Sequence, residues 1–296
     1  MWRVWLWQGV QFVLSLAGAM ALASLLVTFS RHTHGFWPFL SVFADTLTNA
    51  FKGDFGNSIL NGQSALRTVS LQIPATLQLM GAGALIAFVV GIPLGIFLSA
   101  SRMLRAAAPL MQIVAAAPVF CAALALIWLS VHMLHWSAPW QTNAMAGSAA
   151  ASGGAWQDML RGLALPALTV GVAGIACVQV ALRRKAAVTL AAPYRVGLRM
   201  MGLSAFEIDL RYVLPALLGA LMASLGEIAL ALFSASAVAE WVFNRQGAAV
   251  LFLKSSASQD WTVAALVLLI FAAIKLLADF IGAAATRLLV PADAAT

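Results

Sequence analysis

Charged side chains are scarce in this sequence. Aspartate, glutamate, lysine and arginine make up 9% of the 296 residues, whereas a soluble domain typically carries about 25%. Apolar residues reach 62%. This balance excludes a water-soluble globule. Because a helical span needs about 20 apolar residues, the chain can supply several spans, and we expect a polytopic membrane protein.

Reactive residue types are also few. Cys121 and Cys177 lie in apolar segments, where small buried side chains are a simpler interpretation than a disulfide or a metal site. The four histidines lie at the expected outer ends of two spans: His32, His34, His132 and His135. Paired histidines could bind a metal, but histidines that simply lie at the membrane interface are the simpler interpretation. We therefore expect no catalytic residue, no bound metal and no cofactor.

The sequence lacks a source of chemical energy. The nucleotide-binding pattern G-x-x-x-x-G-K-[ST] does not occur in it. If the protein moves a solute, the energy must come from another subunit or from a gradient. The formal net charge is +7, but the basic residues stand singly between apolar runs without an aromatic-interleaved patch, so nucleic acid is not expected as a partner.

Six apolar runs are long enough to cross a bilayer, and they predict an all-α protein with about six transmembrane helices in one domain that covers residues 1–296. The first run is too long for the apolar part of a signal peptide and is interpreted as an uncleaved anchor. The runs are roughly Gln8–Phe29, Pro74–Ala100, Pro109–Leu134, Leu165–Leu182, Tyr212–Ala239 and Trp261–Leu289.

Basic residues predict the orientation of these spans. With the amino terminus in the cytoplasm, ten lysines and arginines face the cytoplasm and six face outward, and Lys275 lies inside the last span. The short basic loops then obey the positive-inside rule, so both termini are expected in the cytoplasm. The long outer loop, about residues 30–73, should contain short surface helices. The long inner loop, about residues 183–215, should form one or two short helices at the membrane face.

The inner loop carries the most specific pattern. Tyr194-Arg195-Val196-Gly197-Leu198-Arg199-Met200-Met201-Gly202-Leu203-Ser204 is followed by Leu214-Pro215. A glycine allows a sharp turn between two short helices, and proline at a helix start sacrifices no hydrogen bond. The pattern resembles the EAA loop of ATP-binding-cassette importer permeases, although Val196-Gly197-Leu198 replace the residues that give that loop its name. An amphipathic connector that lies on anionic lipid is the simpler alternative.

Other motifs resemble the B-type subunits of dipeptide, oligopeptide and nickel permeases. Gly53-Asp54-Phe55-Gly56-Asn57-Ser58 is similar to their outer-loop G-D-[LF]-G-x-S. Pro74-Ala75-Thr76-Leu77-Gln78-Leu79 and Gly91-Ile92-Pro93-Leu94-Gly95 match motifs of their second span. Glu240-Trp241-Val242-Phe243, with Gly247 and Asp260, resembles the family's E-x-x-F, Gly and later Asp. The ordered resemblance covers nearly the whole chain.

The resemblance implies a type I ABC importer permease, a multi-pass subunit of the bacterial inner membrane. It would pair with a second permease subunit, two cytoplasmic ABC ATPases and a periplasmic or extracytoplasmic solute-binding protein, within membrane lipid, and would import peptides or a related small solute such as a nickel complex. ATP hydrolysis would occur on the ATPases. The residues implied in coupling are Tyr194, Arg195, Gly197, Leu198, Arg199, Gly202, Leu203, Ser204, Leu214 and Pro215. Those of the outer-side motif are Gly53, Asp54, Gly56, Ser58, Glu240, Phe243, Gly247 and Asp260.

Three charged residues lie deep inside the expected spans, away from the span ends. Lys275 and Asp279 are spaced i, i+4 and should form a pair on one helix. Glu227 either lines the translocation pathway or pairs with Lys275, because a charge at bilayer depth needs protein or water around it. A gradient-driven carrier would use these three residues as ion sites, although no internal repeat is visible. A membrane enzyme that uses the histidines is a further alternative.

Overall fold

The computed structural model describes residues 2–30, 36–59, 61–100, 118–133, 155–191 and 194–289. These residues form helices, together with a single antiparallel bridge between Asn57 and Ser64. Five helical segments of the described chain are long and apolar enough to cross a membrane: Trp7–Thr28, Ala65–Gly95, Gly162–Arg183, Leu225–Val242 and Trp261–Arg287. The predicted all-α membrane fold is therefore confirmed.

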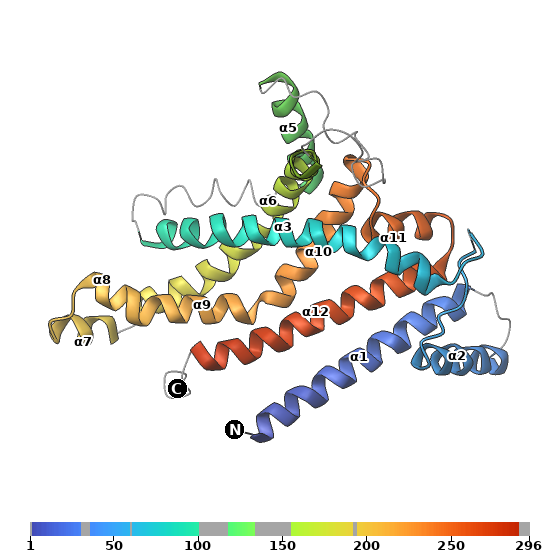
Figure 1. Cartoon of the computed structure of the whole chain (residues 1–296). Helices are drawn as coiled ribbons and strands as arrows, with labels where there is room; N and C mark the ends of the chain where they lie inside the picture. The colour runs from blue at the N-terminus through green and yellow to red at the C-terminus, as the bar shows by residue number, and fades with distance from the viewer. Residues whose placement is uncertain are drawn as a thin grey trace.

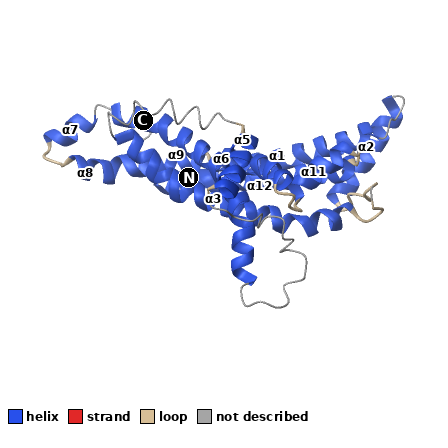
Figure 2. Cartoon of the chain, turned by 90° about the horizontal axis from the view of Figure 1, so that it is seen from above, coloured by secondary structure: helices blue, strands red, loops and turns tan. Residues whose placement is uncertain are grey.

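The long helices run between two ends of the molecule (Figure 1). At one end lie α7 (Tyr194–Met200) and α8 (Ala205–Ile208), and at the other lie α2 (Phe36–Phe51) and α11 (Ala248–Ala257). Figure 2, seen from above, shows the same separation. The helix α1 (Trp2–Ser30) ends near α2, and α12 (Trp261–Leu289) begins near α11. We refer to these two ends as the α7 end and the α11 end.

The centre of the fold is the contact between α3 (Ala65–Ala100) and α6 (Ala155–Ala191). Glycines on both helices allow the two backbones to approach closely. A β-carbon on Gly83 would lie 2.5 Å from Cγ1 of Val170, and one on Gly171 would lie 2.7 Å from Cγ2 of Ile86. Small residues at a helix interface permit this kind of packing inside a bilayer, where apolar burial alone does not drive association.

Gly91 and Gly95 are packing residues within this subunit. Gly91 faces Val178, and a β-carbon on Gly95 would lie 2.7 Å from Cδ1 of Leu182. Both partners are on α6, so the four-residue spacing serves the α3–α6 contact. The carbonyl of Gly91 also accepts a hydrogen bond of 3.0 Å from Nε2 of the buried Gln179.

A second close contact joins α12 to α9 (Leu214–Ala223) and α10 (Leu225–Val242). A β-carbon on Gly282 would overlap the carbonyl of Met222, and one on Gly226 would overlap the Asp279 carboxylate. The hydroxyl of Thr286 donates to the carbonyl of Gly219, at 3.0 Å. Asp279, Gly282 and Thr286 recur at i, i+3 and i+7 on α12, so one face of α12 meets both α9 and α10.

Several predicted span boundaries are wrong. The helix α3 begins at Ala65, nine residues before Pro74, because Ala65 and Val69 are fully buried on one face despite the polar residues between them. The helix α6 continues past Leu182 to Ala191, since Ala186 and Thr189 are buried on its continuing face. The inner loop is therefore shorter than expected, and the basic residues 183–185 belong to a helix.

The predicted fifth span, Tyr212–Ala239, is two helices. The break falls at Ser224, between α9 and α10. The Ser224 hydroxyl is 2.9 Å from the carbonyl of Ala220 and 3.1 Å from that of Leu221. Such bonds compete with the regular ladder and bend helices. Of the predicted third span, Pro109–Leu134, residues 118–133 are described and contain α5 (Val119–His132); residues 101–117 and 134 lie outside the described part.

Candidate functional site

Two short helices form a compact turn at the α7 end (Figure 1). After α7, Gly202 adopts a φ of +89°, a left-handed conformation that costs other residues roughly 1–2 kcal/mol. The amide of Leu203 donates to the carbonyl of Leu198 at 3.2 Å, and that of Gly202 donates to Arg199 at 3.0 Å. This is a glycine-terminated helix end of the Schellman type. The glycine predicted to turn the chain does so.

Beyond the turn, α8 is stabilised by a capping box. The Glu207 carboxylate accepts hydrogen bonds from the Ser204 amide at 2.9 Å and the Ser204 hydroxyl at 2.8 Å. The Glu207 amide donates back to that hydroxyl. The hydrogen bonds from Ser204 hold the pKa of Glu207 below its ordinary value of 4.5, with Arg211 a smaller influence. The spacing of Ser204 and Glu207 is the S-x-x-E pattern that signals such a box in a sequence.

The tip of the turn is apolar and exposed. Met200 and Met201 are 84% and 77% exposed, although methionine normally lies inside a protein. After the turn, the chain enters α9 through the Leu214-Pro215 pair, with the proline in the first turn of the helix. Methionine side chains adapt to varied partner surfaces, so this tip is suited to contact another protein.

At the α11 end, Glu240 is a buried carboxylate that joins three helices. Its Oε1 accepts the Thr76 hydroxyl of α3 at 2.5 Å, and its Oε2 accepts the Val250 amide of α11 at 2.7 Å. Thr76 in turn accepts the Ala248 amide at 2.7 Å. Free amides at the start of α11 are therefore bound by side chains of α3 and α10. We call Thr76 and Glu240 the first α11 anchor.

Gly247 and Arg245 complete the surroundings of this anchor. A β-carbon on Gly247 would overlap the Glu240 carboxylate, so only glycine leaves room for it. The amide of Arg245 donates to the Glu240 carbonyl at 2.8 Å, and its guanidinium donates to the Gly162 carbonyl of α6 at 3.2 Å. Burial lowers the pKa of Arg245, and the nearby Glu240 opposes that shift.

Asp260 forms a second anchor at the other end of α11. Its Oδ2 accepts the Ser58 hydroxyl at 2.5 Å and the Ile59 amide at 3.1 Å. Its own amide donates to the carbonyl of Ser255 at 2.8 Å. We call Ser58 and Asp260 the second α11 anchor. Two segments about 200 residues apart in sequence, the expected outer loop and the start of α12, are joined there.

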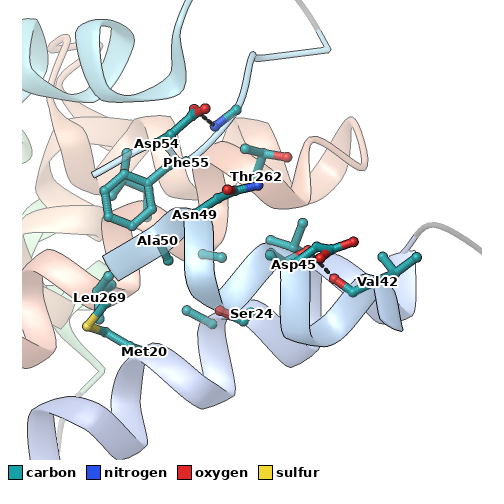
Figure 3. A pocket seen from close by; sticks show the side chains of 16 residues that line it. Met20, Ser24, Val42, Asp45, Asn49, Ala50, Asp54, Phe55, Thr262 and Leu269 are labelled. Carbon is teal, nitrogen blue, oxygen red and sulfur yellow. Dashed lines mark hydrogen bonds between the residues drawn. The ribbon is translucent and has the colours of Figure 1, made fainter. Parts of the chain in front are cut away.

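A small cavity lies next to the loop that precedes Ser58 (Figure 3). It has a volume of about 150 Å³ and lies between α1, α2, the 54–56 loop and α12, with Met20, Asp45, Asn49, Asp54 and Leu269 among its lining residues. An Asp54 oxygen accepts the Gly56 amide at 3.0 Å, which fixes the loop. The predicted Asp54 and Gly56 thus shape the loop around Ser58, and Gly53 and Gly56 take positive φ values of 81° and 79°.

A larger cavity lies on the membrane-spanning part, between α6, α9 and α10. Its volume is about 560 Å³, and Cys177, Ala220, Glu227 and Lys185 line it. Glu227 is exposed in this cavity. Lys275 and Asp279 form a pair at 2.5 Å on α12, as predicted, so the alternative pairing of Glu227 with Lys275 is not what the structure contains.

Most predicted site residues gather at the two ends. Glu240, Phe243, Gly247 and Asp260 surround α11, and Phe243 is fully buried. Thr76 is a site residue that was not predicted, although the motif from Pro74 to Leu79 contains it. Within the described residues, no cluster of three or more histidines, cysteines and acidic residues could hold a metal. His132 stacks on Trp128 with ring centroids 5.0 Å apart, and the other three histidines lie outside the described part.

Comparison with known proteins identifies the class of this fold. A family model described as "Binding-protein-dependent transport system inner membrane component" matches residues 83–292, which is more than half of the chain. The chain belongs to this family. It is a permease subunit of a binding-protein-dependent ABC importer, with the type I permease fold, several membrane-spanning helices and no enzymatic activity of its own, because ATP hydrolysis occurs on separate ATPase subunits. A search of curated proteins finds no match.

Proposed function

We propose that this subunit forms one half of the translocation pore of a peptide-type importer. The cargo is a dipeptide, an oligopeptide or a related small solute such as a nickel complex. A second permease subunit supplies the other half, two ABC ATPases attach on the cytoplasmic side, and a solute-binding protein delivers the cargo outside. Residues 1–296 act as one permease domain.

The observation that carries this proposal is the turn at Gly202. It joins two short helices, exposes Met200 and Met201, and leads into α9. A compact tip with a fixed backbone can follow the movement of a bound ATPase and pass that movement into the membrane-spanning helices. ATP binding can bias the pore only through contacts that differ between its two states, and the coupling-loop residues Tyr194–Ser204 supply those contacts.

The same proposal orients the chain in the membrane. The α7 end is cytoplasmic, and so are the start of α1 and the end of α12, which lie toward it (Figure 2). The α11 end then faces outward, where the two α11 anchors fix the helix that meets the solute-binding protein. This orientation agrees with the ten-to-six division of basic residues.

The alternatives are less well supported. A gradient-driven carrier would need Glu227, Lys275 and Asp279 as free ion sites, but Lys275 and Asp279 bind each other. A membrane enzyme would need a reactive cluster, and membership of a permease family argues against one. The importer is the function that we retain.

A glycine comparison tests the proposal. Gly202→Val should strain the turn, whereas Gly81→Val lies within the helical backbone of α3, outside the coupling loop, with no atom within 4 Å of the added β-carbon. We expect both variants to insert, and we expect only Gly202→Val to lose copurification with the ATPases and transport-coupled hydrolysis. Full uptake by Gly202→Val at normal ATPase stoichiometry would contradict the proposal. Uptake of labelled dipeptides and nickel chelates by the complete complex would identify the cargo.

A further inference from the structure

Glu227 differs from the other charged residues within the spans. Glu240 accepts hydrogen bonds from Thr76 and Val250, and Lys275 binds Asp279. No hydrogen bond or ion pair of the Glu227 side chain is found among the residues that the structure describes. Its side chain is nevertheless exposed, in the first turn of α10. An unpaired carboxylate at this position requires water or a cation beside it.

Glu227 also lies far from both membrane faces. Its neighbour Gly226 contacts Asp279 of α12, so the two helices place Glu227 at the level of Asp279. By helix rise, this level is roughly 15 Å from the last residue of α12 and roughly 27 Å from its first. The carboxylate is therefore within the hydrocarbon depth and not at an interface.

The cavity beside Glu227 is large enough for a small solute. Its volume of about 560 Å³ falls in the range of roughly 300–1,000 Å³ that is usual for ligand sites. Small side chains, Ala176, Ala220 and Ala223, form much of its wall. Its second charged residue, Lys185, is eight residues after Cys177 on α6, which is roughly 12 Å along the helix. The part of the cavity around Glu227 is therefore negatively charged and lies between apolar walls.

We propose that Glu227 makes this cavity selective for positively charged groups, so that the solute presents an ammonium, a guanidinium or a cationic metal complex to it during passage. This inference rests on the proposed function and deepens it, because it names the charge of the cargo at that point. A carboxylate between low-dielectric walls attracts cations and repels anions more strongly than one in bulk water does. Lys275 is paired with Asp279 and does not neutralise Glu227.

Cys177 provides a probe that needs no knowledge of the cargo, because it lines the same cavity. The experiment uses the complete importer in lipid nanodiscs, with Cys121→Ser in this subunit. A cationic trimethylammonium methanethiosulfonate and an anionic sulfonate methanethiosulfonate are applied separately. The rate of modification of Cys177 by each reagent is measured by mass spectrometry. Any effect on the reactivity of the thiol itself cancels in the ratio of the two rates.

We expect the cation-to-anion rate ratio to fall by about tenfold or more in Glu227→Gln. Glu227→Asp should keep most of the ratio, and Asp45→Asn, which changes an exposed carboxylate of α2 outside this cavity, should leave it unchanged. An unchanged ratio in Glu227→Gln would overturn the inference, since a cation from the partner subunit would then neutralise the residue. Failure of both reagents to modify Cys177 would also overturn it, because the cavity would be closed to water. Copurification with the ATPases, scored on the same samples, tests the proposed function separately.

Discussion

Thr76 is the residue whose removal most directly tests the first α11 anchor. Its hydroxyl donates to Glu240 at 2.5 Å and accepts the Ala248 amide at 2.7 Å. Thr76→Val keeps the side-chain shape but deletes both bonds. A hydrogen bond to a charged group contributes about 1.5–3 kcal/mol, and a buried amide without a partner costs about 1–3 kcal/mol. We therefore expect a loss of about 3–5 kcal/mol in the free energy of unfolding.

The matched control is Thr169→Val on α6. Thr169 is as fully buried as Thr76, but its hydroxyl donates only to the carbonyl of Leu165 in its own helix, at 3.0 Å. That carbonyl belongs to the regular helix ladder, so the loss should stay near 1 kcal/mol. Both variants remove the same atoms from a buried site. The difference between them isolates the inter-helix bonds.

Thermal unfolding of the purified subunit in detergent, followed by circular dichroism, measures the effect. Thr76→Val should lower the midpoint by roughly 10 °C, and Thr169→Val by a few degrees at most. Hydrogen exchange should also accelerate at the amides of Ala248–Val250 in Thr76→Val alone. Equal midpoints for the two variants, or unchanged exchange at the start of α11, would refute the anchor.

Three further predictions concern packing and pH. Gly83→Ala should destabilise the subunit by about 1–3 kcal/mol through overlap with α6, whereas Gly81→Ala, with no atom near the added carbon, should leave the unfolding midpoint equal or higher. Gly247→Ala should displace the Glu240 carboxylate and accelerate exchange at the start of α11, and unchanged exchange would contradict the steric argument. Folding lowers the pKa of Glu207. The stability that the ionised Glu207 adds to α8 is therefore fully present at a pH above the ordinary pKa of glutamate, and it is lost as the pH falls through the lowered pKa of the folded state. Exchange at α8, corrected for intrinsic rates, should show this acid-induced opening in the native chain and not in Glu207→Gln.

The long helices were predictable because their apolar runs are longer than those found in helices of soluble proteins. Hydropathy located the first and last spans within a few residues. It failed at α3, where the polar residues after Ala65 lowered the average although one helix face remained buried. It also failed at Ser224, because a single serine that bonds back to its own helix leaves no trace in an average over many residues.

The sites were predictable to different degrees. Gly202 and Pro215 act through backbone geometry, which residue type reveals directly. Glu240 and Asp260 could be quoted from motifs, but their partners Thr76 and Ser58 lie more than 160 residues away in sequence. No local pattern reports such a contact. The exposure of Glu227 likewise depends on how α6, α9 and α10 pack, which requires the three-dimensional structure.

The tight fit of α9 against α12 has a mechanical consequence. Gly282 contacts the backbone of α9, and the Thr286 hydroxyl donates a hydrogen bond to that backbone. The helices α9 and α12 therefore cannot slide past each other without breaking this hydrogen bond. We therefore expect α9 and α12 to move together when a partner displaces the methionine tip. The break at Ser224 lies about one turn before Glu227, so a movement of α9 would reach α10 next to that carboxylate.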